Sequence, residues 1–182
     1  INAISLLARL ELAGVDVGPR WADVADHLAL RLADHVLPFL DLQYLYGLAR
    51  AGHTEAARAL LHNITTHAAT RTEAHERTVW QQVCLPAAHG LLAHAQGDWA
   101  TAVEQLGVAL PRLVEIGGSH AQRDLFHQIR LDALQRNGQW AAVQNLLQPL
   151  CNAQPQSARL ARQARRVNQA LGLPDPAPQY FE

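Results

Sequence analysis

The chain has 182 residues, a formal net charge of −1 and 49% hydrophobic residues, few of which are aromatic. This length fits one domain or one repeat array, and the near-neutral charge argues against bulk electrostatic attraction to nucleic acid or anionic membranes. All fifteen basic residues are arginine, and no apolar run reaches the ~18–20 residues that a membrane-spanning helix needs. Leucine and alanine dominate, which favours helices packed on helices.

Apolar periodicity and helix-ending residues predict a succession of helices with short connections. The predicted helices cover residues 2–13, 19–34, 39–51, 54–68, 79–95, 98–116, 119–137, 139–150 and 156–171. Residues 70–76 are polar and predict a loop, and residues 173–182 contain three prolines and predict an extended tail. Pro86 and Pro111 lie inside predicted helices, and we expect Pro86 to kink its helix or to mark where that helix begins.

One pattern recurs at Gly52, Gly97 and Gly138, where a glycine stands in the position of a left-handed helix cap. A leucine that can pack back onto the preceding helix follows nine residues after each glycine: Leu61, Leu106 and Leu147. The pattern predicts an all-α fold of stacked antiparallel helical hairpins, a right-handed α-solenoid of the tetratricopeptide type over residues 1–172. Gly90 predicts a close crossing of the two helices that Gly97 joins.

The last predicted helix is strongly amphipathic. Leu160, Ala164, Val167 and Leu171 form its apolar stripe, and its other face carries four arginines: Arg159, Arg162, Arg165 and Arg166. We interpret the basic face as the solvated side of a terminal capping helix, in preference to an anion-binding patch.

The two cysteines, Cys84 and Cys151, are far apart, and each lies within an apolar helical pattern. We therefore expect buried thiols in a reducing compartment, which predicts a cytoplasmic protein, and no disulfide framework. The chain begins at Ile1 in the middle of an apolar pattern, so we expect it to be a piece of a longer polypeptide.

The segment from Gly117 to His127 is the best candidate for a functional site. Ser119 and Gln122 match a capping box, which gives part of the segment a purely structural explanation. Four further residues, His120, Arg123, Asp124 and His127, share one helical face, and a second apolar face of the same helix lies nearly opposite. We therefore expect this quartet to lie in a packed interface or in a concave groove.

Several explanations compete for the quartet. The interpretation we favour is a buried hydrogen-bond and salt-bridge network that fixes the register between repeats. The alternatives are a groove site in which Arg123 binds a carboxylate or another anion, a metal site of His120, Asp124 and His127 with a fourth ligand from elsewhere, and catalysis.

Three residues on earlier helices are also candidates for a groove. His89 shares a face with Gln82 and Gln96, although we favour a lone solvated histidine over a groove residue. Asp41 shares a face with Tyr44 near the start of its helix, where a carboxylate suits the helix dipole, so we expect a capping residue. The other histidines, His27, His35, His53, His62, His67, His75 and His94, show no convincing ligand spacing.

Residues 5–21, 85–99 and above all 116–126 are similar to the tetratricopeptide repeat protein 38 family. The resemblance covers most of residues 1–151 and corresponds to the carboxy-terminal part of a typical member. It implies a cytosolic helical-repeat protein without a firmly assigned reaction. The chain has Gln43 where members of the family tend to have histidine.

The sequence thus favours a non-catalytic scaffold that binds a protein or peptide, not nucleic acid or membrane, in a concave groove. The candidate groove residues are Asp41, Tyr44, His89, His120, Arg123, Asp124 and His127. No catalytic residue, metal or cofactor is assigned, because the sequence contains no phosphate-binding loop, nucleophile elbow or paired-cysteine box. The alternative is a ligand- or metal-dependent enzyme whose site is shared with a missing amino-terminal half. A third interpretation is self-association through an apolar surface at the Ile1 end.

Overall fold

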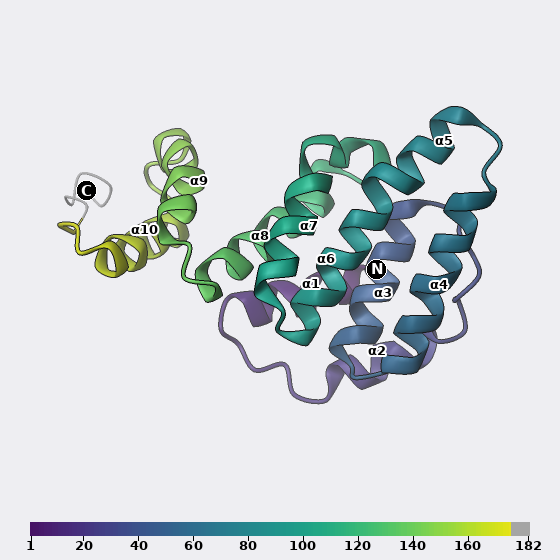
Figure 1. The fold of residues 1–182 in the computed structure, drawn as a ribbon. Coiled ribbons are helices and arrows are strands. Elements are labelled where there is room, and N and C mark those ends of the chain that lie inside the picture. Colours follow the sequence, from purple (N-terminus) through teal and green to yellow (C-terminus); the bar gives the residue numbers. More distant parts are fainter. Residues whose placement is uncertain (176–182) are drawn as a thin grey trace. The chain divides into compact units, whose positions relative to one another are not determined.

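The computed structural model describes residues 1–175, and this range is all-helical, without a β-strand (Figure 1). The predicted all-α class is confirmed. The chain divides into two compact units, one from Ile1 to Ala133 and one that begins at Leu134. Within residues 1–175, every helix is too short or too polar to cross a bilayer.

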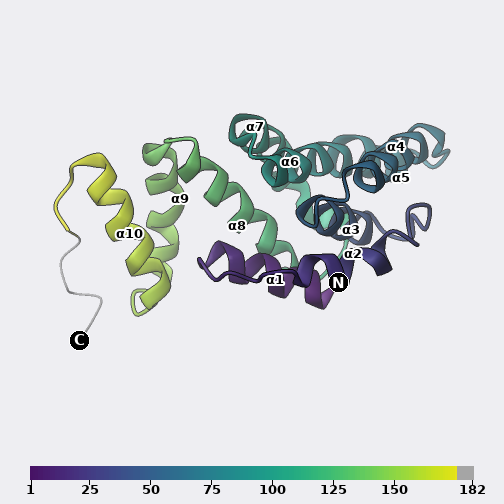
Figure 2. The same cartoon turned by 90° about the horizontal axis from the view of Figure 1, so that it is seen from below.

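The first unit is built around a central helix. Its elements are α1 (Asn2–Leu12), α2 (Arg20–Leu28), α3 (Pro38–Arg50), α4 (Thr54–Thr70), α5 (Ala74–Val79), a π-helical turn η1 (Trp80–Cys84), α6 (Leu85–Gln96), α7 (Trp99–Ala109), a 3₁₀ helix η2 (Leu110–Ile116) and the first part of α8 (His120–Arg136). Helix α3 packs against α1, α2, α4 and α6, and Figure 2 shows α1 and α2 on one side of it and α4 and α6 on the other. Leu42, Leu45 and Leu48 of this helix are fully buried.

Two helical hairpins of this unit are closed by glycines, as the sequence predicts. Gly52 joins α3 to α4 with a φ of 77°, and Gly97 joins α6 to α7 with a φ of 82°. Both angles are in the left-handed region, which residues with a Cβ atom rarely adopt. The next N–H after each glycine bonds back to a carbonyl of the preceding helix, from His53 to Leu48 and from Asp98 to Ala93. Asp98 then caps α7 by accepting a bond from the Thr101 N–H at 3.1 Å.

The crossing of α6 and α7 is as close as Gly90 predicts. A Cβ atom on Gly90 would stand 2.7 Å from Leu106 Cγ and 2.9 Å from the Leu106 backbone nitrogen. Leu106 is fully buried, so its backbone and side chain have no free space into which to move. Only glycine allows the two helices to lie at this distance.

Pro86 marks the start of helix α6, which is one of the two outcomes expected for it, and Pro111 lies where α7 ends. Upstream of Pro86 the chain forms the π turn η1, in which the Leu85 N–H bonds to the Trp80 carbonyl. Proline has no N–H to bond the carbonyl four residues back, and a wider turn accommodates this loss. At Pro111, α7 gives way to the 3₁₀ helix η2, so the single helix predicted for residues 98–116 is wrong in its second half.

Two predicted boundaries are also wrong. The chain is helical again from Ala74, so the loop expected over residues 70–76 shrinks to Arg71–Glu73. Residues 75–77 are exposed and polar, so this short helix carries no apolar period that would reveal it in the sequence. Helix α2 ends at Leu28, and the segment up to Leu37 is a loop that Asn63 fastens by donating a bond to the Leu32 carbonyl at 2.8 Å.

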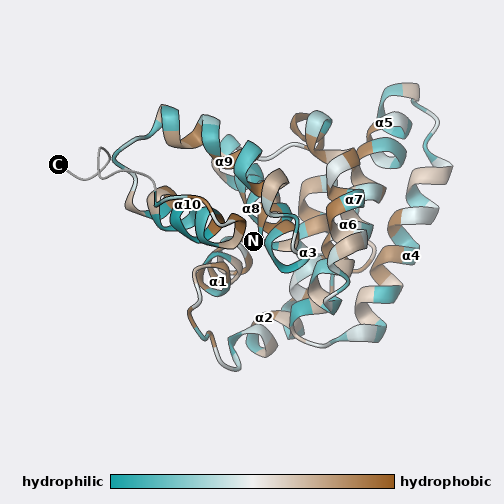
Figure 3. Ribbon diagram, turned by 60° about the vertical axis from the view of Figure 1, so that its left-hand side comes forward, coloured by the Kyte–Doolittle hydropathy of each residue, from teal (hydrophilic) through white to brown (hydrophobic). Residues whose placement is uncertain are grey.

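The second unit contains the end of α8, α9 (Trp140–Ala153) and α10 (Ala158–Leu171). Gly138 has a φ of 70°, which agrees with the left-handed helix cap predicted at this position. Helices α9 and α10 pack through buried residues that include Val143, Leu147, Leu160 and Val167. The four arginines of α10 are exposed, as predicted, and Figure 3 shows this helix as largely hydrophilic. Of the predicted tail, residues 173–175 are non-helical and residues 176–182 lie outside the described range.

Candidate functional site

The quartet predicted on α8 is less buried than expected. His120 and His127 are exposed, and Arg123 and Asp124 are half-buried. The apolar burial of α8 begins only at Leu125 and Phe126, one turn into the helix. The expectation of a packed interface around the quartet is therefore wrong, since the start of a helix can carry polar residues that its neighbours do not cover.

The capping box at the start of α8 is confirmed. The Ser119 N–H donates to Gln122 Oε1 at 2.7 Å, and the Gln122 N–H donates to Ser119 Oγ at 3.3 Å. Each side chain thus satisfies a backbone donor of the first turn. Helix capping therefore accounts for Ser119 and Gln122 without a functional site.

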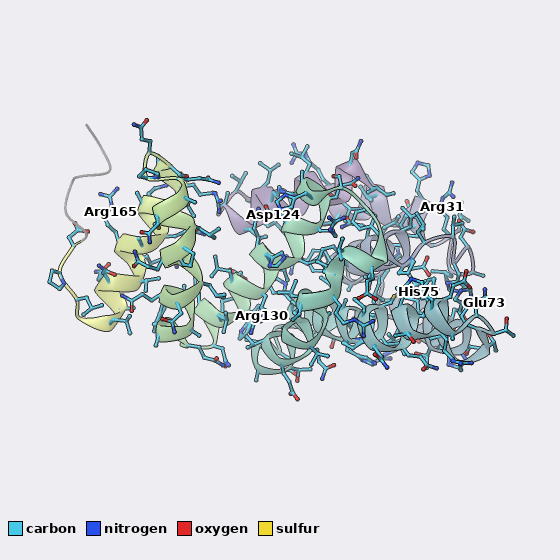
Figure 4. The ribbon with its side chains drawn as sticks, turned by 90° about the horizontal axis from the view of Figure 1, so that it is seen from above. Arg31, Glu73, His75, Asp124, Arg130 and Arg165 are labelled. Atoms are coloured by element: carbon cyan, nitrogen blue, oxygen red, sulfur yellow. The ribbon has the colours of Figure 1, made fainter. Side chains whose placement is uncertain are left out.

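Arg123 and Asp124 also have local partners. The Arg123 guanidinium donates to the carbonyls of Gly117 and Gly118, and Asp124 accepts a bond from Gln128. Figure 4 shows Asp124 and Arg130 leaving α8 on different sides, and Arg130 donates to the Val103 carbonyl of α7. Arg123 therefore holds the loop before α8 in place.

The metal interpretation finds no support in the geometry. Among residues 1–175, no group of three or more His, Cys, Asp or Glu side chains is arranged to hold a metal ion. His120, Asp124 and His127 therefore do not form such a set. Partial desolvation lowers the pKa of His127, against the raising effect of the nearby Asp124.

A buried polar network does exist, but on other residues. His94 Nδ1 lies 3.2 Å from the Tyr46 hydroxyl, and His94 Nε2 lies 2.9 Å from Asp132 Oδ2. His94 and Tyr46 are buried, and the three residues belong to α6, α3 and α8. This network links α3, α6 and α8, and it does so with residues other than the quartet that was expected to fix the register between repeats.

The candidates on α3 and α6 separate into an exposed and a buried group. His89 is exposed on the same solvated face as Gln82 and Gln96, which agrees with a solvated histidine. Tyr44 and Asp41 are buried. Asp41 is not a cap, because Leu37 occupies the N-cap position of α3 and the Asp41 carboxylate bonds to a histidine.

That histidine is His35, which sequence reasoning left unassigned. Its Nδ1 lies 2.6 Å from Asp41 Oδ2, and the side chains are 10% and 1% exposed. Burial raises the pKa of Asp41, and the hydrogen bond from His35 opposes this shift. His35 has a φ of 44°, and it is the only residue other than glycine with a positive φ in the described part of the chain. A positive φ is uncommon outside glycine, although histidine adopts it more often than most other residues.

Two further rings complete this cluster. The His67 ring of α4 packs against His35 with centroids 4.7 Å apart and a tilt of 37°, and the Trp80 ring of η1 meets His67 at 4.5 Å and 67°. Cys84 is fully buried in the same turn, and burial, with the neighbouring carboxylate of Asp41, raises its pKa well above the usual value. The His35 cluster, defined by His35, Asp41, His67 and Trp80, therefore gathers residues from a loop, α3, α4 and a π turn. Single π turns within α-helices often occur at functional sites.

The pKa of His67 is lowered, mainly by burial and further by the charges of Arg71 and His35. Between the folded and unfolded pKa values the unfolded chain binds more protons, so the free energy of unfolding should fall as the pH falls below about 6.5. We expect His67→Gln to reduce this slope in urea unfolding at pH 7.5 and 5.5. His62→Gln, at an exposed position of the same helix, should leave it unchanged. A wild-type slope in the His67 variant would contradict this assignment.

Sequence reasoning missed His35, His67 and His94 because their partners are distant in the chain. Asp41 follows His35 by only six positions, but His67 follows it by 32, and Asp132 follows His94 by 38. The local signals available were the break in helical pattern at residues 35–38 and the Asp41 carboxylate in an otherwise apolar helix. Neither a protein-family model nor a solved structure matches this chain.

Proposed function

We propose that this chain is a helical-repeat scaffold of the tetratricopeptide type, a right-handed stack of hairpins that binds a protein or peptide partner in the cytosol. The observation that carries the proposal is that two glycine-closed hairpins, α3 with α4 and α6 with α7, pack together through α3 and α6. Stacked hairpins present one helix of each pair side by side, which suits an extended partner. The resemblance of residues 116–126 to the tetratricopeptide repeat protein 38 family points the same way.

We assign the partner's contacts to two polar surfaces of the first unit. One is the exposed face of η1 and α6 that carries Gln82 on η1 and His89 and Gln96 on α6. The other is the exposed start of α8 at His120, which is anchored to the start of α3. The anchor is the Phe39 ring, which lies against Gly118 so closely that a Cβ there would meet it at 3.0 Å. Arg123 supports this second surface through the carbonyls of Gly117 and Gly118.

Site-specific photocross-linking tests the proposal. A benzophenone amino acid placed at position 89 should cross-link a defined partner in a lysate of the source cells, and the same probe at exposed position 62 on α4 should not. The partner should then bind the purified chain and lose affinity on His89→Ala. Identical products from both positions would count against the assigned surface. A product of twice the chain's mass, with a dimer in sedimentation velocity, would replace the foreign partner by a second copy.

A further inference from the structure

Charge is distributed unevenly between the two units, although the whole chain is nearly neutral. Residues 1–133 contain ten arginines and fourteen acidic residues, which gives the first unit a formal net charge of −4. Residues 134–182 contain five arginines and two acidic residues, so the second unit carries +3. Both of these acidic residues follow α10 in the sequence. A separation of charge along a chain points to a charged partner for one of its parts.

The arginines of the two units differ in their partners as well. Each of the ten in the first unit pairs with a carboxylate or donates to a backbone carbonyl. On α10, Arg159, Arg162 and Arg166 are exposed, and they form no ion pair or hydrogen bond with any residue that the structure describes. Their guanidinium groups can therefore direct their N–H donors to an anion from outside the chain.

These three residues, here called the arginine stripe, lie on one side of α10. At about 100° per residue, they occupy roughly 60° of the helix circumference. They lie away from the side on which Leu160 and Val167 are buried against α9. Along the axis the three positions are three and four residues apart, which corresponds to about 4.5 and 6 Å.

We propose that the arginine stripe is a docking surface for an acidic helical segment of a protein partner, with carboxylates at positions i, i+3 and i+7 that pair with the three guanidinium groups. The spacing favours a helical partner, because carboxylates placed in this way on a helix repeat at the same intervals of about 4.5 and 6 Å. Alternate residues of an extended chain lie about 6.7 Å apart and would lose register with the stripe. Carboxylates suit arginine, whose planar group binds both carboxylate oxygens at once.

The stripe suits an acidic protein better than it suits a membrane or a nucleic acid. An interfacial helix binds a membrane by inserting its apolar face, and the apolar face of α10 is already buried against α9. Single-stranded nucleic acids bind in basic grooves with stacking aromatic rings, and Trp140 is the only aromatic residue from 134 to 175. The stripe spans about 10 Å, so it can neutralise few of the roughly six to ten phosphates that a duplex-binding protein contacts.

Two peptides of about 18 residues, long enough to form helices in water, test this surface. One carries glutamate at positions i, i+3 and i+7, and the other carries glutamine there. We expect the glutamate peptide to bind the 182-residue chain about tenfold more tightly, which is the combined effect of three exposed ion pairs. Titration of the isotope-labelled chain by NMR measures such weak affinities and should place the shifted signals in α10. At about 1 M salt, which screens charges beyond about 3 Å, the preference should disappear.

Changing the whole stripe to glutamine, with Arg159→Gln, Arg162→Gln and Arg166→Gln, should abolish the preference for the glutamate peptide. Glutamine is a good helix former, and the three positions are exposed, so this stripe variant should stay folded. Circular dichroism checks that it does.

The matched control removes the same number of charges from three exposed arginines of the first unit: Arg31→Gln, Arg58→Gln and Arg77→Gln. It should retain the preference. Equal affinities of the wild-type chain for the two peptides, or a preference that survives in the stripe variant, would overturn the proposal. Tighter binding of a short RNA duplex or of phosphatidylserine vesicles, lost in the stripe variant, would overturn it in favour of that polyanion. Because the photocross-linking test concerns residues of the first unit, either proposal can fail without the other.

Discussion

Gly90→Ala is expected to lower the free energy of unfolding by about 2 kcal/mol, as overpacking of a close helix crossing does. The added Cβ would stand 2.9 Å from the Leu106 backbone nitrogen, so relief requires α6 and α7 to separate and not merely a side chain to rotate. Alanine favours a helix over glycine by about 1 kcal/mol, and the steric cost has to exceed this gain.

Gly107→Ala is the matched control, because it makes the same change on the facing helix α7. There the added Cβ would meet the tip of the flexible Arg130 side chain at 3.2 Å, and this tip can move. We expect its free energy of unfolding to change by less than about 1 kcal/mol. Urea unfolding followed by circular dichroism gives both values. Equal effects at the two positions would show that the crossing is not limited by Gly90.

His94→Ala is expected to lower the free energy of unfolding by about 3 kcal/mol. The substitution removes a buried ring and takes away one bond each from the Tyr46 hydroxyl and the Asp132 carboxylate. It also removes the edge contact between His94 and Trp99, whose centroids are 5.3 Å apart. Loss of a buried polar partner costs more than the bond itself contributes, because the remaining groups stay in the protein interior.

His89→Ala provides the comparison for this variant, since His89 is exposed on the same helix and should change stability by less than about 0.5 kcal/mol. Tyr46→Phe combined with His94→Ala should cost less than the sum of the single changes, because the two side chains share a bond. Additive costs would show that the Tyr46 and His94 side chains do not act together.

Features that depend on local chemistry were predictable from the sequence. The left-handed turns at Gly52 and Gly97, the close approach at Gly90 and the capping box of Ser119 each depend on residues near one another in the chain or on the lack of a Cβ atom. Such constraints act on the backbone directly, and tertiary packing rarely overrides them.

The candidate site was less predictable because its parts meet only in three dimensions. A helical wheel groups His120 with Arg123, but it does not say which face a neighbouring helix covers, and that face proved to begin at Leu125. The His35 cluster could not be predicted from the sequence for a related reason. His67 and Trp80 contact His35 from elements that follow it by tens of residues, so no local spacing in the sequence predicts these contacts.

Because α3 is central, its few polar side chains help to determine which elements can pack against it. Gln43 bonds to Ser5 of α1, Asp41 bonds to His35 of the preceding loop, and Tyr46 bonds to His94 of α6. Each of these groups lies where water cannot replace a wrong partner, so a helix docked on the wrong side or one turn out of step would leave it unpaired. These three hydrogen bonds lie on different sides of an otherwise apolar helix. Each therefore specifies which segment packs on that side of α3 and in which register.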